Sequence, residues 1–337
     1  MPAITELFNK EKAINIVLKG QIAPMPIRDM VFGKAKSVDS DVLPARYWTK
    51  TLKAIPTCSG TTGAEPMSKT DISLINYDFG SFFAKTDFTA QEQLNFEKMS
   101  GASGQAEISR LIQDDGLVSK DLYDENMCAS AMSGKLSIKT RVNADGTFST
   151  YDITYGTVST TARAGASWAT ASKSAIYKDL KKSHKAIETQ MKRTISKREV
   201  INFASETAFQ DLFEICEKTQ TNDNVAVKYG TDAAGYDFIE LNGYRVYDIA
   251  GEVIDAEDQS SSNTVADNYI QAVYIGKGAG HGIFNLKIPN RKADFRPLPM
   301  IVFAVEKDNG KGFTTYFEGK PCTVFNVAAS TKMLVIS

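Results

Sequence analysis

The sequence predicts an α+β fold, and three stretches of the chain support this prediction. Helical periodicity covers most of residues 89–132, and a long two-stranded hairpin follows it directly. From Gly235 onward, short strand-like runs largely replace the helical pattern. Helices and strands therefore both contribute, in separate parts of the chain, as they do in α+β proteins.

The composition is that of a globular protein with a sizeable core. The chain has 337 residues, so one large or two smaller domains are expected. Hydrophobic residues make up 42% and charged residues 23%, which are ordinary values for such a protein. The net charge of −1 predicts no general affinity for nucleic acid or for an anionic membrane, although a local basic patch could still provide one.

The sequence contains no targeting or membrane-spanning pattern. The amino terminus mixes charged and apolar residues, and nowhere do 18 apolar residues follow one another. We therefore expect a soluble protein that stays where it is made. The four cysteines lack C-x-x-C spacing, so we expect unpaired thiols in a reducing compartment and no structural zinc; they are Cys58, Cys128, Cys216 and Cys322.

The first part of the chain predicts an arm followed by a protruding ribbon. Residues 1–35 form the arm, which is apolar and is interrupted by Pro24, Pro26 and Gly33. Residues 46–55 and 70–83 alternate as extended strands around a tip rich in Gly, Ser and Thr. A lone ribbon is marginally stable in water, so a neighbouring molecule would cover it; an ordinary surface hairpin is the alternative. The candidate inter-subunit contacts are Trp48, Leu52, Pro66 and Met67.

The centre of the chain predicts a long helix that runs into a hairpin. We expect breaks in the helix at residues 101–104 and at Gly116, and its end at Gly134 in the left-handed conformation. After Gly134 the hydrophobic period changes from about four to two, with a turn at residues 143–146. These residues offer no catalytic group. A long helix joined to a long hairpin suggests a framework for contacts between subunits.

The second half of the chain begins with a linker of small residues at 157–174. A helix over residues 175–193 follows, with an apolar stripe at helical spacing. Residues 200–216 predict a buried strand and then a helix that Ser205 caps. The remainder is mainly strand, with a turn at Asn242 and Gly243.

No motif in the chain supports an enzyme. Residues 276–282, GKGAGHG, come nearest to a phosphate-binding loop, but that loop needs Ser or Thr after its lysine and then a helix. Strand-like residues follow instead, so a glycine-rich turn is predicted. His184 and His281 have no sequence neighbours that suggest a triad, although a triad assembled from distant residues stays open. We predict no catalytic, cofactor-binding or metal-binding residues.

The one strong charge asymmetry lies in residues 173–200, which carry nine Lys or Arg residues against three acidic ones. One interpretation is a solvated helix face. The other is a patch that faces a polyanion or an acidic partner, with strongly salt-dependent binding. The candidate polyanion or scaffold contacts are Lys181, Lys182, Lys185, Lys192 and Arg193.

Three segments, in this order, resemble one protein family: SAMSGKLSIKTRV at the helix-to-hairpin junction, Gly-Ala-Ser-Trp at residues 165–168, and VINFASETAFQDLFEICEK at residues 200–218. The sequence is similar to lambda-type major capsid proteins of tailed phages, the "capsid protein E" family with the Hong Kong 97-type fold. The resemblance implies an N-terminal arm (1–35), an extended β-hairpin loop (36–86), a peripheral domain with a long spine helix (87–158) and an axial domain (159–310). Residues 311–337 are predicted to be the closing strands. The domain to which they belong is left open, because Cys322-Thr-Val-Phe departs from the family pattern.

The resemblance also implies a function. The chain would be a major capsid protein that self-assembles into hexamers and pentamers of an icosahedral head around double-stranded DNA. Its other implied partners are a separate scaffolding protein, a portal and a decoration protein, with no cofactor and no membrane contact. It would be assembled in the host cytoplasm and end in the virion. The alternatives are an encapsulin-like compartment shell protein and a phage tail or adaptor protein.

Overall fold

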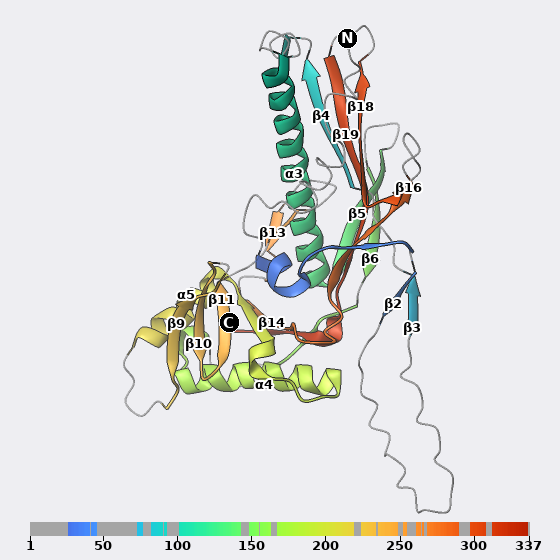
Figure 1. Ribbon diagram of the computed structural model, residues 1–337. Helices are drawn as coiled ribbons and strands as arrows, with labels where there is room; N and C mark the ends of the chain where they lie inside the picture. The colour runs from blue at the N-terminus through green and yellow to red at the C-terminus, as the bar shows by residue number, and fades with distance from the viewer. Residues whose placement is uncertain are drawn as a thin grey trace, which may run out of the picture.

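The computed structural model of the chain has a mixed α+β architecture. A long helix stands beside a tall, narrow sheet, and a second sheet with two helices lies at the foot of both (Figure 1). The structure describes residues 26–40, 42–45, 73–76, 82–89, 91–92, 101–142, 148–154, 156–162, 167–218, 224–233, 235–248, 252–254, 261–263, 265, 268–289, 297–307 and 312–335.

The long helix α3 (Gly101–Ser133) is continuous, so the predicted break at Gly116 is wrong. The helix begins at Gly101, and residues 93–100 lie outside the described residues, so the predicted break at residues 101–104 stays a prediction. A glycine inside a helix is less favourable than alanine by about 1 kcal/mol, so Gly116 calls for a packing reason. The reason is Phe317, since a Cβ at position 116 would lie 2.6 Å from the Cζ atom of its ring. The glycine therefore lets the helix approach the sheet closely.

The end of α3 confirms the prediction made for Gly134. This residue has φ +98°, and a Cβ there would lie 2.7 Å from the carbonyl oxygen of Gly156. The hairpin follows at once, with β5 (Lys135–Val142) antiparallel to β6 (Phe148–Thr154) and Leu136 opposite Ile153. A bulge between Lys139 and Arg141 shifts the register, so the predicted two-residue alternation is interrupted at Thr140.

The tall sheet beside α3 is built around one long strand. At one end this strand pairs with β15, and at the other it lies between β18 and β4. Phe313 stacks on Phe88 at 4.6 Å, and the fully buried Phe317 packs against α3. We call it the five-stranded sheet; its members are β1 (Lys36–Val38), β15 (Gly282–Leu286), β19 (Gly312–Val324), β18 (Met300–Glu306) and β4 (Phe82–Thr89).

The sheet at the foot has seven strands. One face carries α4 (Lys173–Met191) and α5 (Glu206–Glu217), and the other packs against the end of α3 and the π-helical turn η2 (Arg28–Phe32). In order the strands are β7 (Ser159–Thr160), β20 (Ser330–Leu334), β14 (Tyr269–Tyr274), β8 (Val200–Ala204), β11 (Tyr244–Asp248), β10 (Asp237–Leu241) and β9 (Val227–Thr231).

Local predictions for this part of the chain are confirmed. The strand β8 is wholly buried, and the side chain of Ser205 caps α5 by accepting a hydrogen bond from the Ala208 N–H. Asn242 and Gly243 form the turn between β10 and β11, both with positive φ (+46° and +91°). The glycine-rich residues 276–282 connect β14 to β15 as a turn and the start of a strand, as predicted.

Three smaller antiparallel pairs complete the described chain: β2 (Val42–Ala45) with β3 (Ser73–Asn76), β12 (Glu252–Ile254) with β13 (Ser261–Asn263), and β16 (Ile288–Pro289) with β17 (Pro297–Leu298). In the first pair the chain leaves along β2 and returns along β3, and the predicted ribbon would lie between them in the sequence. The predicted strand at residues 46–55 lies outside the described residues. So do the ribbon tip and the arm up to residue 25.

The two large sheets draw their strands from several of the predicted ranges. Strands β1 and β4 fall in the range predicted for the extended loop, yet both pair within the five-stranded sheet. Strands β15 and β18 fall in the range predicted for the axial domain and also belong to that sheet. The closing strands separate, since β19 lies in the five-stranded sheet and β20 in the seven-stranded one. The physical reason is that the chain crosses between the sheets more than once.

The departure at Cys322 does not disturb the closing strands. Cys322 is buried in β19 and is paired in register with Phe284 of β15. Cys128, Cys216 and Cys322 are all buried and are in no disulfide, as predicted, and Cys58 lies outside the described residues. Within the described ranges, no helix has the length and apolar character that a membrane span needs.

Candidate polyanion-contact surface and assembly fold

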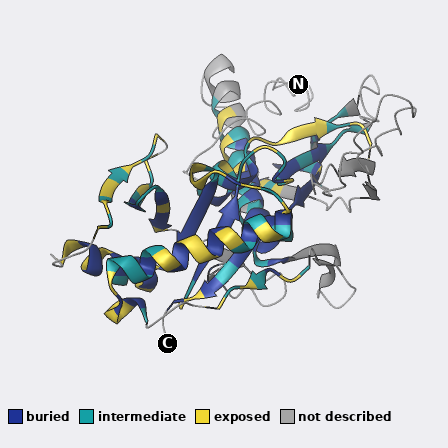
Figure 2. Cartoon of the chain, turned by 90° about the horizontal axis from the view of Figure 1, so that it is seen from below, coloured by how far each residue is buried: buried dark blue, intermediate teal, exposed yellow. Residues whose placement is uncertain are grey.

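Helix α4 presents one buried face and one solvent face. Its amino terminus is capped by Ser172, whose hydroxyl accepts a hydrogen bond from the Ala175 N–H at 3.2 Å. The predicted stripe is confirmed: it lies against the seven-stranded sheet, at most 1% exposed, and consists of Ile176, Leu180, Ile187 and Met191. Figure 2 shows the result, with buried and exposed positions alternating along the helix. The sequence therefore leaves the opposite face of α4 to the solvent.

That solvent face is a row of lysines. At 100° per residue its members fall within an arc of about 100°, and 14 residues at 1.5 Å each give it a length of about 21 Å. We call this row the lysine stripe; its members, all exposed, are Lys178, Lys181, Lys182, Lys185 and Lys192. The sequence analysis missed Lys178, although its i, i+4 spacing to Lys182 was the available signal.

Arg193, by contrast, does not belong to the stripe. Its guanidinium lies 4.5 Å from the centroid of the Tyr274 ring, and Nη2 donates a hydrogen bond to the carbonyl of Lys277 at 2.8 Å. The side chain thus ties the end of α4 to the turn after β14. Arg193 is therefore a structural contact and is not available to a polyanion in this arrangement.

The acidic residues near the stripe are occupied by other contacts. The buried Asp179 accepts a hydrogen bond from the indole Nε1 of Trp168 at 3.1 Å. Glu199 accepts from the backbone N–H of Ser196 at 3.4 Å, as part of a capping box. Among the acids that the structure describes, Glu188 reaches the stripe, through Lys185 Nζ at 2.9 Å. Little local negative charge therefore offsets the lysines, and the stripe carries a positive potential.

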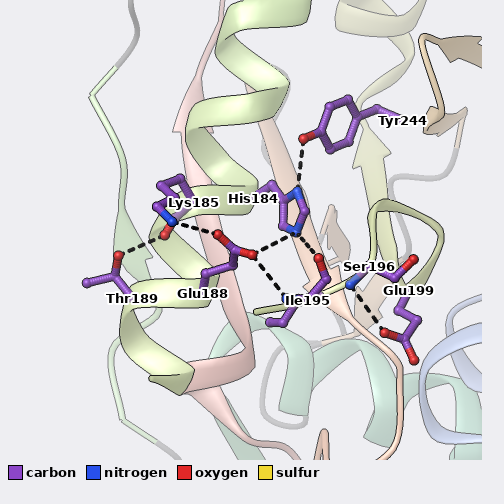
Figure 3. A network of polar contacts seen from close by, with 8 residues as sticks. All are labelled: His184, Lys185, Glu188, Thr189, Ile195, Ser196, Glu199 and Tyr244. Atoms are coloured by element: carbon purple, nitrogen blue, oxygen red, sulfur yellow. Dashed lines mark hydrogen bonds and ion pairs between the residues drawn. The ribbon is translucent and has the colours of Figure 1, made fainter. Parts of the chain in front are cut away.

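Glu188 is itself held in place by the loop that follows α4 (Figure 3). Its Oε1 accepts a hydrogen bond from the Ile195 N–H at 3.0 Å. Burial alone would raise the pKa of Glu188, but this hydrogen bond and the Lys185 ammonium outweigh it and lower the pKa. The carboxylate therefore stays charged and fixes the loop.

His184 is a packing residue of the same network, and Figure 3 shows it between α4, β11 and the loop. Its Nε2 lies 3.0 Å from the Ile195 carbonyl, which can only accept, so Nε2 carries the proton. Nδ1 then accepts from the hydroxyl of Tyr244 at 2.9 Å. Burial lowers the pKa of His184. Both ring nitrogens are used in packing, which leaves neither as a free general base.

His281 is likewise built into the core. It stacks on Phe325 with ring centroids 4.6 Å apart, while Nε2 donates to the Tyr274 carbonyl and Nδ1 accepts from the Asn326 N–H. Burial lowers the pKa of His281 to about 4. Across the described parts of the chain, no group of three or more His, Cys, Asp or Glu residues could hold a metal ion.

The ribbon contacts cannot be placed in the same way. Trp48, Leu52, Pro66 and Met67 all lie outside the described residues, so their role as inter-subunit contacts stays a prediction. The structure supplies only the base of the ribbon, where Val42 lies opposite Asn76 and Ala45 opposite Ser73.

A tall sheet backed by a single long helix, with a seven-stranded sheet and its two helices at the foot, is the architecture of the Hong Kong 97-type fold. A crystal structure described as a prophage capsid protein of Escherichia coli CFT073 has this fold, with a TM-score of 0.57 and 11% identity. The match covers 98% of this chain and 99% of that one.

The chain belongs to the phage major capsid protein E family, whose model matches residues 18–331. Two further structures are similar at lower scores. The mature capsid of bacteriophage PhiM1 has a TM-score of 0.47 and 14% identity, over 94% of this chain and 88% of that one. The SrpI encapsulin of Synechococcus elongatus PCC 7942 has 0.44 and 9%, over 98% and 96%. None of the curated protein sequences matches the chain.

The family confirms the function predicted from the sequence. The protein is a major capsid protein of a tailed phage, a self-assembling subunit of the icosahedral head and hence a component of the virion. It is a structural protein by family and not an enzyme.

Proposed function

We propose that the chain forms the hexamers and pentamers of a phage head and that the lysine stripe of α4 contacts the packaged double-stranded DNA. The observation that carries the second part is the row of five exposed lysines with one neighbouring carboxylate. The stripe contains no aromatic or aliphatic side chain that an acidic peptide could use as an anchor. A row of point charges suits a sequence-independent contact with phosphates.

The division into subdomains is part of this proposal. We assign α3, the five-stranded sheet and the β5–β6 hairpin to the peripheral domain, and the seven-stranded sheet with α4 and α5 to the axial domain. The ribbon that starts at β2 and returns at β3 is the extended loop, and the chain before η2 is the arm. What supports this division is that these strands form two separate large sheets, with α4 and α5 packed on the seven-stranded one.

The test of the stripe is a charge reversal with a matched control. The variant carries Glu at Lys181, Lys182 and Lys185, and the control carries Glu at the exposed Lys218, Lys228 and Lys277. Each variant changes the net charge from −1 by three times −2, to −7. A difference between them therefore comes from the position of the charge and not from its amount.

We expect the stripe variant to form shells at the yield of the control but to retain less DNA, measured as nuclease-protected DNA per particle. In binding of duplex DNA to the unassembled subunit, loss of three phosphate contacts would lower the slope of log K against log salt by about 2.7. Loss of particles with normal DNA content would point to an acidic scaffolding protein as the partner. Equal yield, DNA content and salt slope in both variants would show that the stripe is only a solvated face.

The ribbon proposal needs its own experiment. We propose that Trp48, Leu52, Pro66 and Met67 contact a neighbouring subunit. Deleting residues 57–68 should then leave a soluble, folded subunit that no longer closes into shells in negative-stain electron microscopy. Normal shells would refute this role. A separate scaffolding protein, a portal and a decoration protein are the further partners that we propose, with assembly in the host cytoplasm.

A further inference from the structure

We propose that Glu188 decides which side of the lysine stripe meets the DNA backbone: it keeps phosphates away from its own flank, so that the backbone runs along Lys178 and Lys182. The inference rests on the DNA contact proposed for the stripe. It adds to that contact a positioning residue, which acts on the DNA through its charge and does not bind it.

Helical geometry gives the lysine stripe two flanks. With about 100° per residue and Lys178 as the origin, Lys182 lies about 40° to one side and Glu188 about 80° to the other. Between Glu188 and the origin, at about 60°, 40° and 20°, lie Lys181, Lys192 and Lys185. We call Lys178 and Lys182 the far flank. Lys182 is the member of the stripe farthest from Glu188 around the helix.

Distance along the helix adds to this separation. At 1.5 Å per residue, Glu188 is about 4.5 Å from Lys185 along the axis. Lys182 and Lys178 are about 9 and 15 Å from it. In water at low salt, two like charges about 7 Å apart change an affinity roughly threefold, and the effect falls with distance. Glu188 therefore repels a phosphate beside Lys185 more strongly than one beside the far flank.

Glu188 cannot turn away from an approaching phosphate, because both of its carboxylate oxygens are held (Figure 3). Oε1 accepts a hydrogen bond from the Ile195 N–H at 3.0 Å, and Oε2 pairs with Nζ of Lys185 at 2.9 Å. Only 14% of the side chain is exposed. Nε2 of His184 lies 3.9 Å from Oε1, but burial lowers the pKa of His184 and leaves the ring neutral at pH 7. The carboxylate is thus a negative charge at a fixed position.

Lys185 has a counter-ion within the protein, and the far flank has none among the described residues. The side chain of Lys185 is 75% exposed, but its ammonium divides its attraction between Glu188 and any phosphate. No acid that the structure describes forms an ion pair with Lys178 or Lys182, and the neighbouring Asp179 is buried and hydrogen-bonded to Trp168. The charge of the far flank is therefore available to phosphates.

The charge of Glu188 can be tested apart from its hydrogen bond. A glutamine side chain keeps a carbonyl oxygen that can accept from the Ile195 N–H. Glu188→Gln therefore removes the negative charge and leaves the loop in place. The matched control is Glu214→Gln, which removes one negative charge from an exposed side chain of α5.

The first test is a double-mutant cycle, read as the affinity of the unassembled subunit for a short DNA duplex at about 10 mM salt, where the Debye length is about 30 Å. Glu188→Gln should raise this affinity roughly threefold, and Glu214→Gln should raise it less. Lys182→Gln should weaken binding at least as much in the wild type as in the Glu188→Gln background. The loss caused by Lys185→Gln should instead be about twofold or more larger in the Glu188→Gln background, because the backbone then moves toward Lys185.

Two results of this cycle would overturn the inference alone. One is an equal loss from Lys185→Gln in both backgrounds, because Glu188 would then weaken binding without directing it. The other is an affinity that Glu188→Gln leaves unchanged while the triple charge reversal of the stripe abolishes binding. A wild-type subunit that does not bind the duplex would refute the proposed DNA contact itself, and this inference with it.

The second test uses the wild-type subunit only. Lysine acetylation, mapped by mass spectrometry with and without the duplex, reports which ammonium groups the DNA covers. The duplex should protect Lys178 and Lys182 more strongly than Lys185 and Lys192. Equal protection of these four lysines, or stronger protection of Lys185, would overturn the inference even if Glu188→Gln fails to fold.

Discussion

Replacing Gln271 by methionine should weaken the attachment of the end of α3 to the seven-stranded sheet. Gln271 lies on β14 and is 0% exposed. Its Nε2 donates hydrogen bonds to the carbonyl of Met132, in the last turn of α3, and to the hydroxyl of Ser330, both at 3.0 Å. The carbonyls of a last helical turn have no partner within the helix, so the amide supplies one. This side chain therefore bonds the end of α3 directly to the sheet.

The size of the effect follows from the groups left behind. Two net hydrogen bonds are worth about 1 kcal/mol each, and a buried carbonyl without a partner adds about 1–3 kcal/mol. Ser330 keeps its own bond to the Ala272 carbonyl at 3.1 Å and adds nothing further. Oε1 of Gln271 has no hydrogen-bond partner, so its removal offsets about 1 kcal/mol. We expect a net loss of about 2–4 kcal/mol in the free energy of unfolding.

The assay is equilibrium urea unfolding of the unassembled subunit, combined with amide exchange in residues 127–133. Gln271→Met should lower the free energy of unfolding and speed exchange in this last turn of α3. Gln210→Met, at an exposed position of α5, is the control and should change the free energy by less than about 0.5 kcal/mol. If Gln271→Met behaves like this control, the amide does not couple the helix to the sheet.

Two further predictions concern residues whose partners lie far away in the sequence. Gly116→Ala should destabilise the subunit by about 1–3 kcal/mol despite the better helix propensity of alanine, because the new Cβ would lie 2.6 Å from the ring of Phe317. In urea unfolding, adding Phe317→Leu should recover part of this loss. If the losses from the two substitutions simply add, this account is wrong. His281, whose pKa burial lowers to about 4, binds no proton in the folded state between pH 6.5 and 4 while the unfolded chain does. The contribution of His281 to stability should therefore hold above pH 6.5 and fall by about 3 kcal/mol as the pH drops to 4. In urea midpoints measured across that window, His281→Gln should remove this part of the pH dependence and leave the part due to His184, whose pKa is also lowered.

The structure follows the sequence closely wherever one short segment decides the outcome. The stripe of α4, the Ser205 cap and the Asn242 turn depend on residues a few positions apart, and all three were predicted. The lysine stripe was largely found for the same reason, since helical spacing alone puts its members on one face. Arg193 shows the limit, because Tyr274 and Lys277 hold its side chain from about 80 residues away.

Long-range pairing explains the larger errors. Gly116 looked like a helix breaker because Phe317, which needs the space, lies 201 positions further on. The sequences of β15 and β18 do not indicate the sheet to which these strands belong, since a strand of the five-stranded sheet and a strand of the seven-stranded sheet show the same apolar alternation. Only the partner strand β19 decides this, and it comes later in the chain. Such choices depend on tertiary contacts that local periodicity does not encode.

The same crossings that hid the sheet assignment also bind the two sheets together. The chain passes from β14 to β15 through His281 and from β19 to β20 through Phe325, and these two rings stack on each other. Phe32, from the turn that ends the arm, lies 6.0 Å from both rings. The side-chain amide of Asn326 adds a hydrogen bond to the Ala279 carbonyl at 2.9 Å. Because both crossings meet in one buried cluster, and Gln271 joins α3 to the same sheet, rotating one sheet against the other would break several buried contacts at once. Changes of shape during assembly should therefore leave the two sheets fixed relative to each other.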